Sequence, residues 1–267
     1  MQEILTNEVK KFAPGQWVQG AGLNPLRIQG REDETYPITC RDIDSVTKDN
    51  PVAIMYNSAH QRGFQVGVHA IGNLAVKTAI DGFIDAMRKH PGDNPRHYVV
   101  HGDMLGDNDD YINAAKHDIV LSSQPVFLLT QFEESIRCVG KEKGERLSPL
   151  KEIKDLGVVL AGGSDAIAGE LVHWRKSVQA AVTRKSAITG NEYRTDLALS
   201  VEDAIRMHTI NGAYQEKKEH IRGSIEVGKV ADFQVLDRDI FTTPPDEIGD
   251  IKVVLTMVDG RIVFERD

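Results

Sequence analysis

Cysteine is scarce in this chain. There are two cysteines in 267 residues, Cys40 and Cys138, and they do not form a CxxC pair. Two cysteines so far apart cannot supply the disulfide framework of a small secreted protein. We therefore expect a reducing compartment, and the cytoplasm is the expected location.

Long apolar runs and an excess of basic charge are also missing. No apolar stretch approaches the roughly 18 residues that a membrane span needs, and the N-terminal segment MQEILTNEVKKF lacks the apolar core of a signal peptide. The net charge is −8, so no basic face is available to neutralise nucleic-acid phosphates. These absences argue against a membrane or nucleic-acid partner.

Several catalytic motifs are absent as well. The sequence contains no glycine-rich phosphate loop, no GxSxG elbow and no Cys/His nucleophile pair. These absences disfavour nucleotide-dependent chemistry and covalent catalysis by serine or cysteine.

What the chain does contain is a series of short apolar runs, each followed by a helical pattern. Short apolar strands that alternate with helices are typical of parallel β/α units in an α/β fold. The expected strands are residues 51–56, 64–69, 97–101, 118–124 and 157–165. The expected helices are residues 74–90, 109–117, 147–156, 171–184 and 200–215, the last with Ser200 as its N-cap.

The C-terminal residues have a different pattern. Residues 231–237 and 253–265 alternate between apolar and polar positions, and residues 258–261, Val-Asp-Gly-Arg, are typical of a hairpin turn. We expect antiparallel sheet here. The division into domains is accordingly 1–222 for the β/α part and 223–267 for a small β segment.

Three of the expected strands end in a residue that can bind metal or transfer a proton. His69, His101 and Asp165 end the second, third and fifth strands. The carboxyl ends of parallel strands meet at one edge, where barrel enzymes carry their chemistry. Imidazole and carboxylate groups suit zinc and similar ions. The pattern alone leaves a second interpretation open, in which each histidine is structural and Asp165 caps a helix.

Several motifs resemble those of one protein family. Residues 67–73, GVHAIGN, resemble the HAIGD motif of metal-dependent amidohydrolases, in the family 3 branch that includes N-substituted formamide deformylase. Residues 96–101, RHYVVH, resemble the RHRIEH strand of that branch, and residues 163–166, GSDA, its GSDAP motif. Residues 209–213 are similar to its TINGA helix, and residues 223–232 to the GSLEPGKLADF entry into its β-sandwich.

The resemblance implies a TIM-like (β/α)₈ barrel with a C-terminal β-sandwich segment. It implies one or two divalent metal ions, zinc foremost, and hydrolysis of a non-peptide C–N bond in a small amide or cyclic amide. His69, His101 and Asp165 would bind the metal. Asp165 and His101 would be the catalytic residues, with Asp165 moving the proton to the leaving nitrogen.

The chain also departs from the family pattern. The family's HxH motif has no counterpart, and His60 is followed within four residues by Phe64 of the next strand, where relatives have a long segment. These departures imply either a truncated or internally shortened member, or a sequence that joins pieces around residues 60–61 across a further stretch. We expect either an incomplete barrel covered by a partner in a homo-oligomer, or a complete barrel with parts that the sequence does not show. Two other functions stay open. One is a catalytically incompetent binding or assembly subunit, and the other is a metal-free enzyme that uses His and Asp as base and acid.

Overall fold

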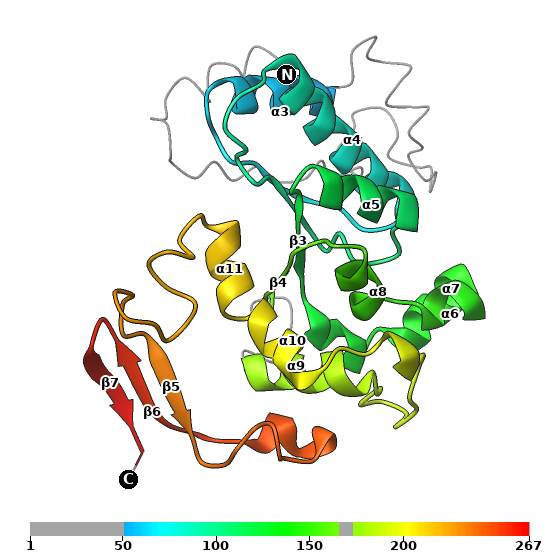
Figure 1. Ribbon diagram of the computed structural model, residues 1–267. Coiled ribbons are helices and arrows are strands. Elements are labelled where there is room, and N and C mark those ends of the chain that lie inside the picture. Colours follow the sequence, from blue (N-terminus) through cyan, green and yellow to red (C-terminus); the bar gives the residue numbers. More distant parts are fainter. Residues whose placement is uncertain (1–50, 166–172, 267) are drawn as a thin grey trace, which may run out of the picture.

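The computed structural model describes residues 51–165 and 173–266 (Figure 1). Cys40 lies outside these residues, and so does the start of the helix expected at 171–184. Within them, no helix is long and apolar enough to cross a membrane.

A four-stranded parallel sheet forms the centre of the β/α part. Its order is β1-β2-β3-β4, so each strand pairs with the next one along the chain. The strands are β1 (Gly67–His69), β2 (Tyr98–Val100), β3 (Val120–Ser123) and β4 (Leu160–Gly162). The parallel β/α arrangement is therefore confirmed. The sheet is open among the described residues, with β1 and β4 as its edges, and does not close into a barrel.

Helices connect these strands and continue after the last one. Between strands lie α4 (Asn73–Lys89), α5 (Asn108–Lys116) and α8 (Leu150–Asp155), as the sequence predicts, and after β4 come α9 (Trp174–Thr183), α10 (Val201–Met207) and α11 (Ile210–Gln215). Five short helices were not predicted: η2 (Pro125–Leu129), α6 (Phe132–Val139), α7 (Lys141–Glu145), η3 (Thr195–Leu197) and η4 (Pro245–Asp250).

The strand predicted at residues 51–56 is wrong, because this segment begins the helix α3 (Pro51–Gln61). Tyr56 and His60 are one helical turn apart and both are buried. The Tyr56 ring lies 4.6 Å from the Phe83 ring of α4, in a space left by Gly82, where a Cβ atom would come within 2.6 Å of it. Packing against α4 therefore decides between helix and strand, which a six-residue apolar run cannot do by itself.

The helix predicted at residues 200–215 is confirmed in part. Ser200 is the N-cap of α10, and its hydroxyl accepts a hydrogen bond from the backbone N–H of Asp203. The helix does not run on to residue 215, because Thr209 has a non-helical backbone (φ −128°, ψ −99°) that separates α10 from α11.

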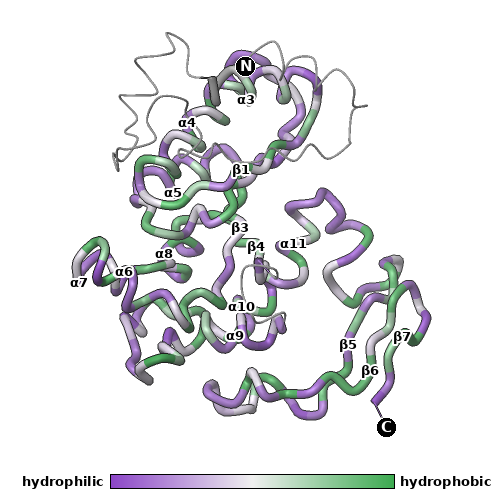
Figure 2. Tube along the Cα trace, turned by 180° about the vertical axis from the view of Figure 1, so that it is seen from behind, coloured by the Kyte–Doolittle hydropathy of each residue, from purple (hydrophilic) through white to green (hydrophobic). Residues whose placement is uncertain are grey.

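The C-terminal sheet is antiparallel, as predicted. Its order is β5-β6-β7, with β5 (Phe233–Leu236), β6 (Val253–Val258) and β7 (Arg261–Glu265). Asp259 and Gly260 form the turn with φ values of 50° and 72°, as a two-residue hairpin with positive φ requires. In Figures 1 and 2, α11 lies between this sheet and β4.

The segment between β5 and β6 packs on the β/α part. Ile240, Ile248 and Ile251 are buried there and belong to the same core cluster as Val178 and Ala181 of α9. The C-terminal sheet is therefore joined to the rest of the molecule by shared apolar packing.

Candidate functional site

His69 and His101 lie side by side at the carboxyl edge of the parallel sheet. His69 is the last residue of β1, and His101 directly follows β2. Because β1 and β2 are neighbours in register, with His69 opposite Val100, the two imidazoles are close. Their ring centroids are 4.8 Å apart in an edge-to-face arrangement of 74°.

Asp165 reaches the same place from the loop after β4. Its Oδ2 atom lies 3.7 Å from Nε2 of His101, and the Asp165 side chain is 44% exposed whereas that of His101 is 4% exposed. The structure thus brings each of the other two predicted residues next to His101.

The backbone at two of these residues is strained. His101 and Asp165 have φ values of 59° and 51°, in the left-handed region that residues other than glycine rarely occupy. His101 begins a tight turn in which the Met104 N–H donates to the His101 carbonyl oxygen at 2.9 Å. A non-glycine residue in this region persists when its surroundings hold it there, and such residues gather at functional sites.

Hydrogen bonds to β3 fix the turn that begins at His101. The N–H of His101 donates to the carbonyl oxygen of Ser122 at 2.9 Å. Two residues on, the buried Asp103 carboxylate accepts a 2.8 Å hydrogen bond from the Ser123 hydroxyl. The Tyr111 hydroxyl donates to the Asp103 carbonyl oxygen at 3.2 Å. The backbone of the turn at His101 is therefore held by hydrogen bonds from β3 and α5.

The environment of His101 favours its neutral form. Burial is the largest cause of its lowered pKa and the neighbouring His69 is the next, whereas Asp165 and the amide of Gln124 act in the opposite direction. A neutral imidazole has one nitrogen with a free lone pair, which is the form that binds metal ions.

The residues present match a metal site in donor type, and in spacing for one pair. Two imidazoles and a carboxylate are suitable ligands for zinc and related divalent ions, and the 3.7 Å between His101 and Asp165 fits two ligands of one ion. However, within residues 51–165 and 173–266 no three His, Cys, Asp or Glu side chains are placed to hold one ion together. The described part of the chain therefore forms a partial site.

Two further side chains adjoin His101. Gln124, just after β3, is buried. The ring of Phe127 in η2 lies 5.6 Å from the His101 ring and was not anticipated. Pro125 marks the end of the strand and is the first residue of η2, but it does not indicate where the Phe127 ring lies.

Three other histidines, His60, His97 and His173, lie away from these strand ends. His97, at the amino end of β2, is fully buried; its Nδ1 accepts the Val66 N–H at 3.0 Å, and its Nε2 lies 3.2 Å from Nδ1 of His60. His60 Nε2 in turn lies 2.8 Å from the carbonyl oxygen of His90. This chain of contacts is internal and structural. His173 is exposed at the start of α9.

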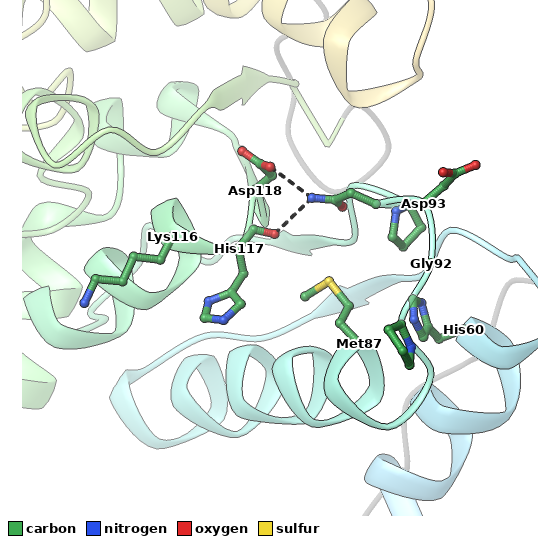
Figure 3. Close-up of a pocket in the computed structure, with 10 residues that line it drawn as sticks. His60, Met87, Gly92, Asp93, Lys116, His117 and Asp118 are labelled. Carbon is green, nitrogen blue, oxygen red and sulfur yellow. Dashed lines mark hydrogen bonds between the residues drawn. The ribbon is translucent and has the colours of Figure 1, made fainter.

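A hollow of about 290 Å³ lies at the opposite, amino edge of the sheet. Figure 3 shows His60, Met87 and His117 around it, with Asn94 donating to the His117 carbonyl oxygen and to Asp118. It borders the segments that precede β2 and β3, so it is separate from the strand ends that carry His69 and His101.

Paired histidines and a carboxylate at the carboxyl edge of a parallel sheet lie where barrel-type enzymes carry their chemistry. Comparison with known proteins identifies the group. The profile of the amidohydrolase family matches residues 32–264. The chain is therefore a member of the amidohydrolase family.

Individual relatives agree with this assignment. The chain is 34% identical over 224 residues to the putative amidohydrolase YtcJ of Bacillus subtilis, covering 83% of this chain and 41% of that protein. It is 26% identical to the N-substituted formamide deformylase of Arthrobacter pascens, covering 78% and 38%. The chain thus spans less than half the length of these curated relatives.

A solved structure shares the fold. An uncharacterized metal-dependent hydrolase from Pyrococcus furiosus matches with a TM-score of 0.61 and 25% identity, over 73% of this chain and 38% of that one. The resemblance to amidohydrolases that the motifs carry is confirmed.

Proposed function

We propose that the protein is a metal-dependent hydrolase that cleaves a non-peptide C–N bond in a small amide or cyclic amide. The observation that carries this proposal is the meeting of His69, His101 and Asp165 at one edge of the sheet. We further propose zinc as the metal, one or two ions, and a partial TIM-like barrel over residues 1–222 followed by the β segment 223–267.

The three site residues would have different roles. His69 and His101 would each offer a ring nitrogen to the metal. A bound divalent metal would polarise the substrate carbonyl and lower the pKa of a water molecule. Asp165 is exposed and lies next to His101, so its carboxylate would take the proton from that water and pass it to the leaving nitrogen. The Phe127 ring would shield one side of His101 from water.

A second candidate is a binding or assembly subunit without turnover. It is favoured by the lack of a three-ligand group among the described residues. Such a protein would still hold a metal through His101 and Asp165, with lower affinity.

Metal analysis tests the proposal. We expect purified protein to contain divalent metal, with the content strongly reduced in His69→Asn and His101→Asn and unchanged in His220→Asn. His220 is exposed and remote in the fold, so it is the matched control. Equal metal content in all four proteins would contradict the proposal.

Hydrolysis assays separate the two candidate functions. A panel of N-formylamines and cyclic amides is incubated with the metal-loaded protein and with Asp165→Asn. Turnover that is lost in Asp165→Asn supports the hydrolase. Metal binding without turnover of any panel member supports the binding subunit.

A further inference from the structure

A second hollow, of about 310 Å³, lies between the start of α9 and the C-terminal sheet. Two arginines line it, Arg175 of α9 and Arg266 directly after β7. The aromatic side chains of Trp174 and Phe264 line it as well, whereas none of the three candidate site residues does. Its volume is at the lower end of the range for small-molecule pockets, so its ligand would be small.

The guanidinium of Arg175 lacks an acidic partner in the part of the chain that the structure describes. Its Nε atom is buried without a hydrogen-bond acceptor among these residues. Asp237 attracts Arg175, but this carboxylate forms its ion pair with Arg238, at 3.7 Å. A buried charged donor without an acceptor is unfavourable, so the hollow favours a bound acceptor.

Arg266 places a second positive charge at the same hollow. Its Nε donates to the Val253 carbonyl oxygen at 3.2 Å, which leaves the terminal nitrogens of its guanidinium for other acceptors. Burial is the largest cause of the lowered pKa of Arg175, and the charge of Arg266 is the next. The two guanidiniums are therefore close enough to repel each other. A bound anion would offset this repulsion and satisfy the buried donor.

The walls beside these charges are aromatic. Trp174 Nε1 donates to the Gln234 side-chain oxygen at 2.9 Å, and the Gln234 amide nitrogen donates to the Thr256 hydroxyl at 3.3 Å. These bonds hold the Trp174 ring against β5 and β6. The guanidinium carbon of Arg175 lies 5.8 Å from the centroid of that ring, and Phe264 is 44% exposed. The hollow thus offers apolar ring surface next to its two positive charges.

We propose that this hollow is a binding site for a small aromatic carboxylate. Arg175 and Arg266 hold the carboxylate group, since a guanidinium donates two parallel hydrogen bonds to a carboxylate. Trp174 and Phe264 contact the ring, because aromatic pairs stack or meet edge to face. An anion without a ring would use only the charges, so the aromatic walls favour an organic acid over an inorganic ion. The site uses none of the residues to which the proposed function assigns hydrolysis.

Isothermal titration calorimetry of the chelator-treated full chain with benzoate tests this proposal. Removal of metal ensures that benzoate does not bind through a metal ion. We expect benzoate to bind the wild type, and to bind Arg175→Gln about 10–100-fold more weakly because a charged hydrogen bond is lost. Arg266→Gln, at an exposed residue, should weaken binding too. Arg261→Gln removes the same charge from a residue of β7 that does not line the hollow, and this matched control should keep the wild-type affinity.

Acetate carries the same charged group without a ring, and we expect it to bind about 10-fold more weakly than benzoate. Equal affinities for acetate and benzoate would overturn the aromatic part of the proposal. Absence of benzoate binding in the wild type overturns the proposal outright, whether or not Arg175→Gln folds. Wild-type affinity in Arg175→Gln and Arg266→Gln, with folding checked by circular dichroism, overturns it as well, because benzoate would then bind elsewhere.

Discussion

At the scale of single residues, the buried histidine His97 makes the molecule sensitive to acid. Burial lowers the pKa of His97 to about 3, with His60 and Lys217 as further causes. Its Nδ1 accepts the Val66 N–H, so protonation of that nitrogen would break the contact. His97 is therefore neutral in the folded state.

This gives a prediction with a defined sign. Between pH 6.5 and about 3 the unfolded state binds a proton at residue 97 that the folded state does not. The stability from neutral His97 is fully present above pH 6.5 and is lost as pH falls, by up to about 1.4 kcal/mol per pH unit. Urea denaturation at pH 7, 5 and 4 measures this slope. His97→Asn should lower this slope by the contribution of about one proton, whereas His220→Asn, at an exposed histidine, should leave the slope unchanged. Equal slopes in all three proteins would refute the assignment.

Only part of the candidate site could be predicted from the sequence. His69, His101 and Asp165 were predictable because each follows an apolar run, and parallel strands align their carboxyl ends. The contact of Phe127 with His101 was not predictable, because it depends on the path of η2 after the strand. The left-handed backbone at His101 likewise follows from tertiary contacts.

At the scale of helices and strands, the cap of α10 is a local feature that sequence identifies well. The Ser200 hydroxyl accepts from the Asp203 N–H at 3.1 Å and donates to the Asp203 carboxylate at 2.8 Å. We expect Ser200→Ala to lower the free energy of unfolding by about 1 kcal/mol. Ser224→Ala, in a loop and without a cap, serves as control in the same denaturation series. A loss as large in the control would show that the cap is not the cause.

Elements that depend on distant partners were predicted less well. The segment 51–56 is apolar and short, and only the contact of Tyr56 with Phe83 decides that it is helical. The strand expected at 64–69 pairs over Gly67–His69 alone, and the N–H of Val66 just before it donates to the His97 side chain rather than to a strand. Local patterns therefore located the elements, whereas packing set their type and length.

At the scale of the whole molecule, shared apolar packing links the C-terminal sheet to the β/α part. Ile248 in η4 is fully buried in the main core cluster. We expect Ile248→Ala to lower the free energy of unfolding by about 2–5 kcal/mol, and near-ultraviolet and far-ultraviolet circular dichroism to report one common transition. Ile225→Ala is the matched control, since Ile225 is 87% exposed. Two separate transitions would show that the sheet unfolds independently.

Barrel closure is the part of the fold that the sequence patterns did not determine. Alternating strands and helices predict parallel pairing between neighbours, and the order β1-β2-β3-β4 agrees. Whether the first and last strands meet depends on the number of strands and on their tilt. Neither quantity is encoded in the periodicity of a single β/α unit.

The left-handed backbone at Asp165 implies a trade between stability and activity. Glycine adopts this conformation without steric cost, so Asp165→Gly should stabilise the fold by up to about 1 kcal/mol while abolishing any hydrolysis. Asp259→Gly relieves the same conformation, φ 50°, in the hairpin turn, and should stabilise the fold equally with activity intact. Thermal unfolding and the amide assay measure both effects. A gain of stability in both variants, with hydrolysis lost only in Asp165→Gly, would show that the strained backbone at Asp165 serves the chemistry of this residue.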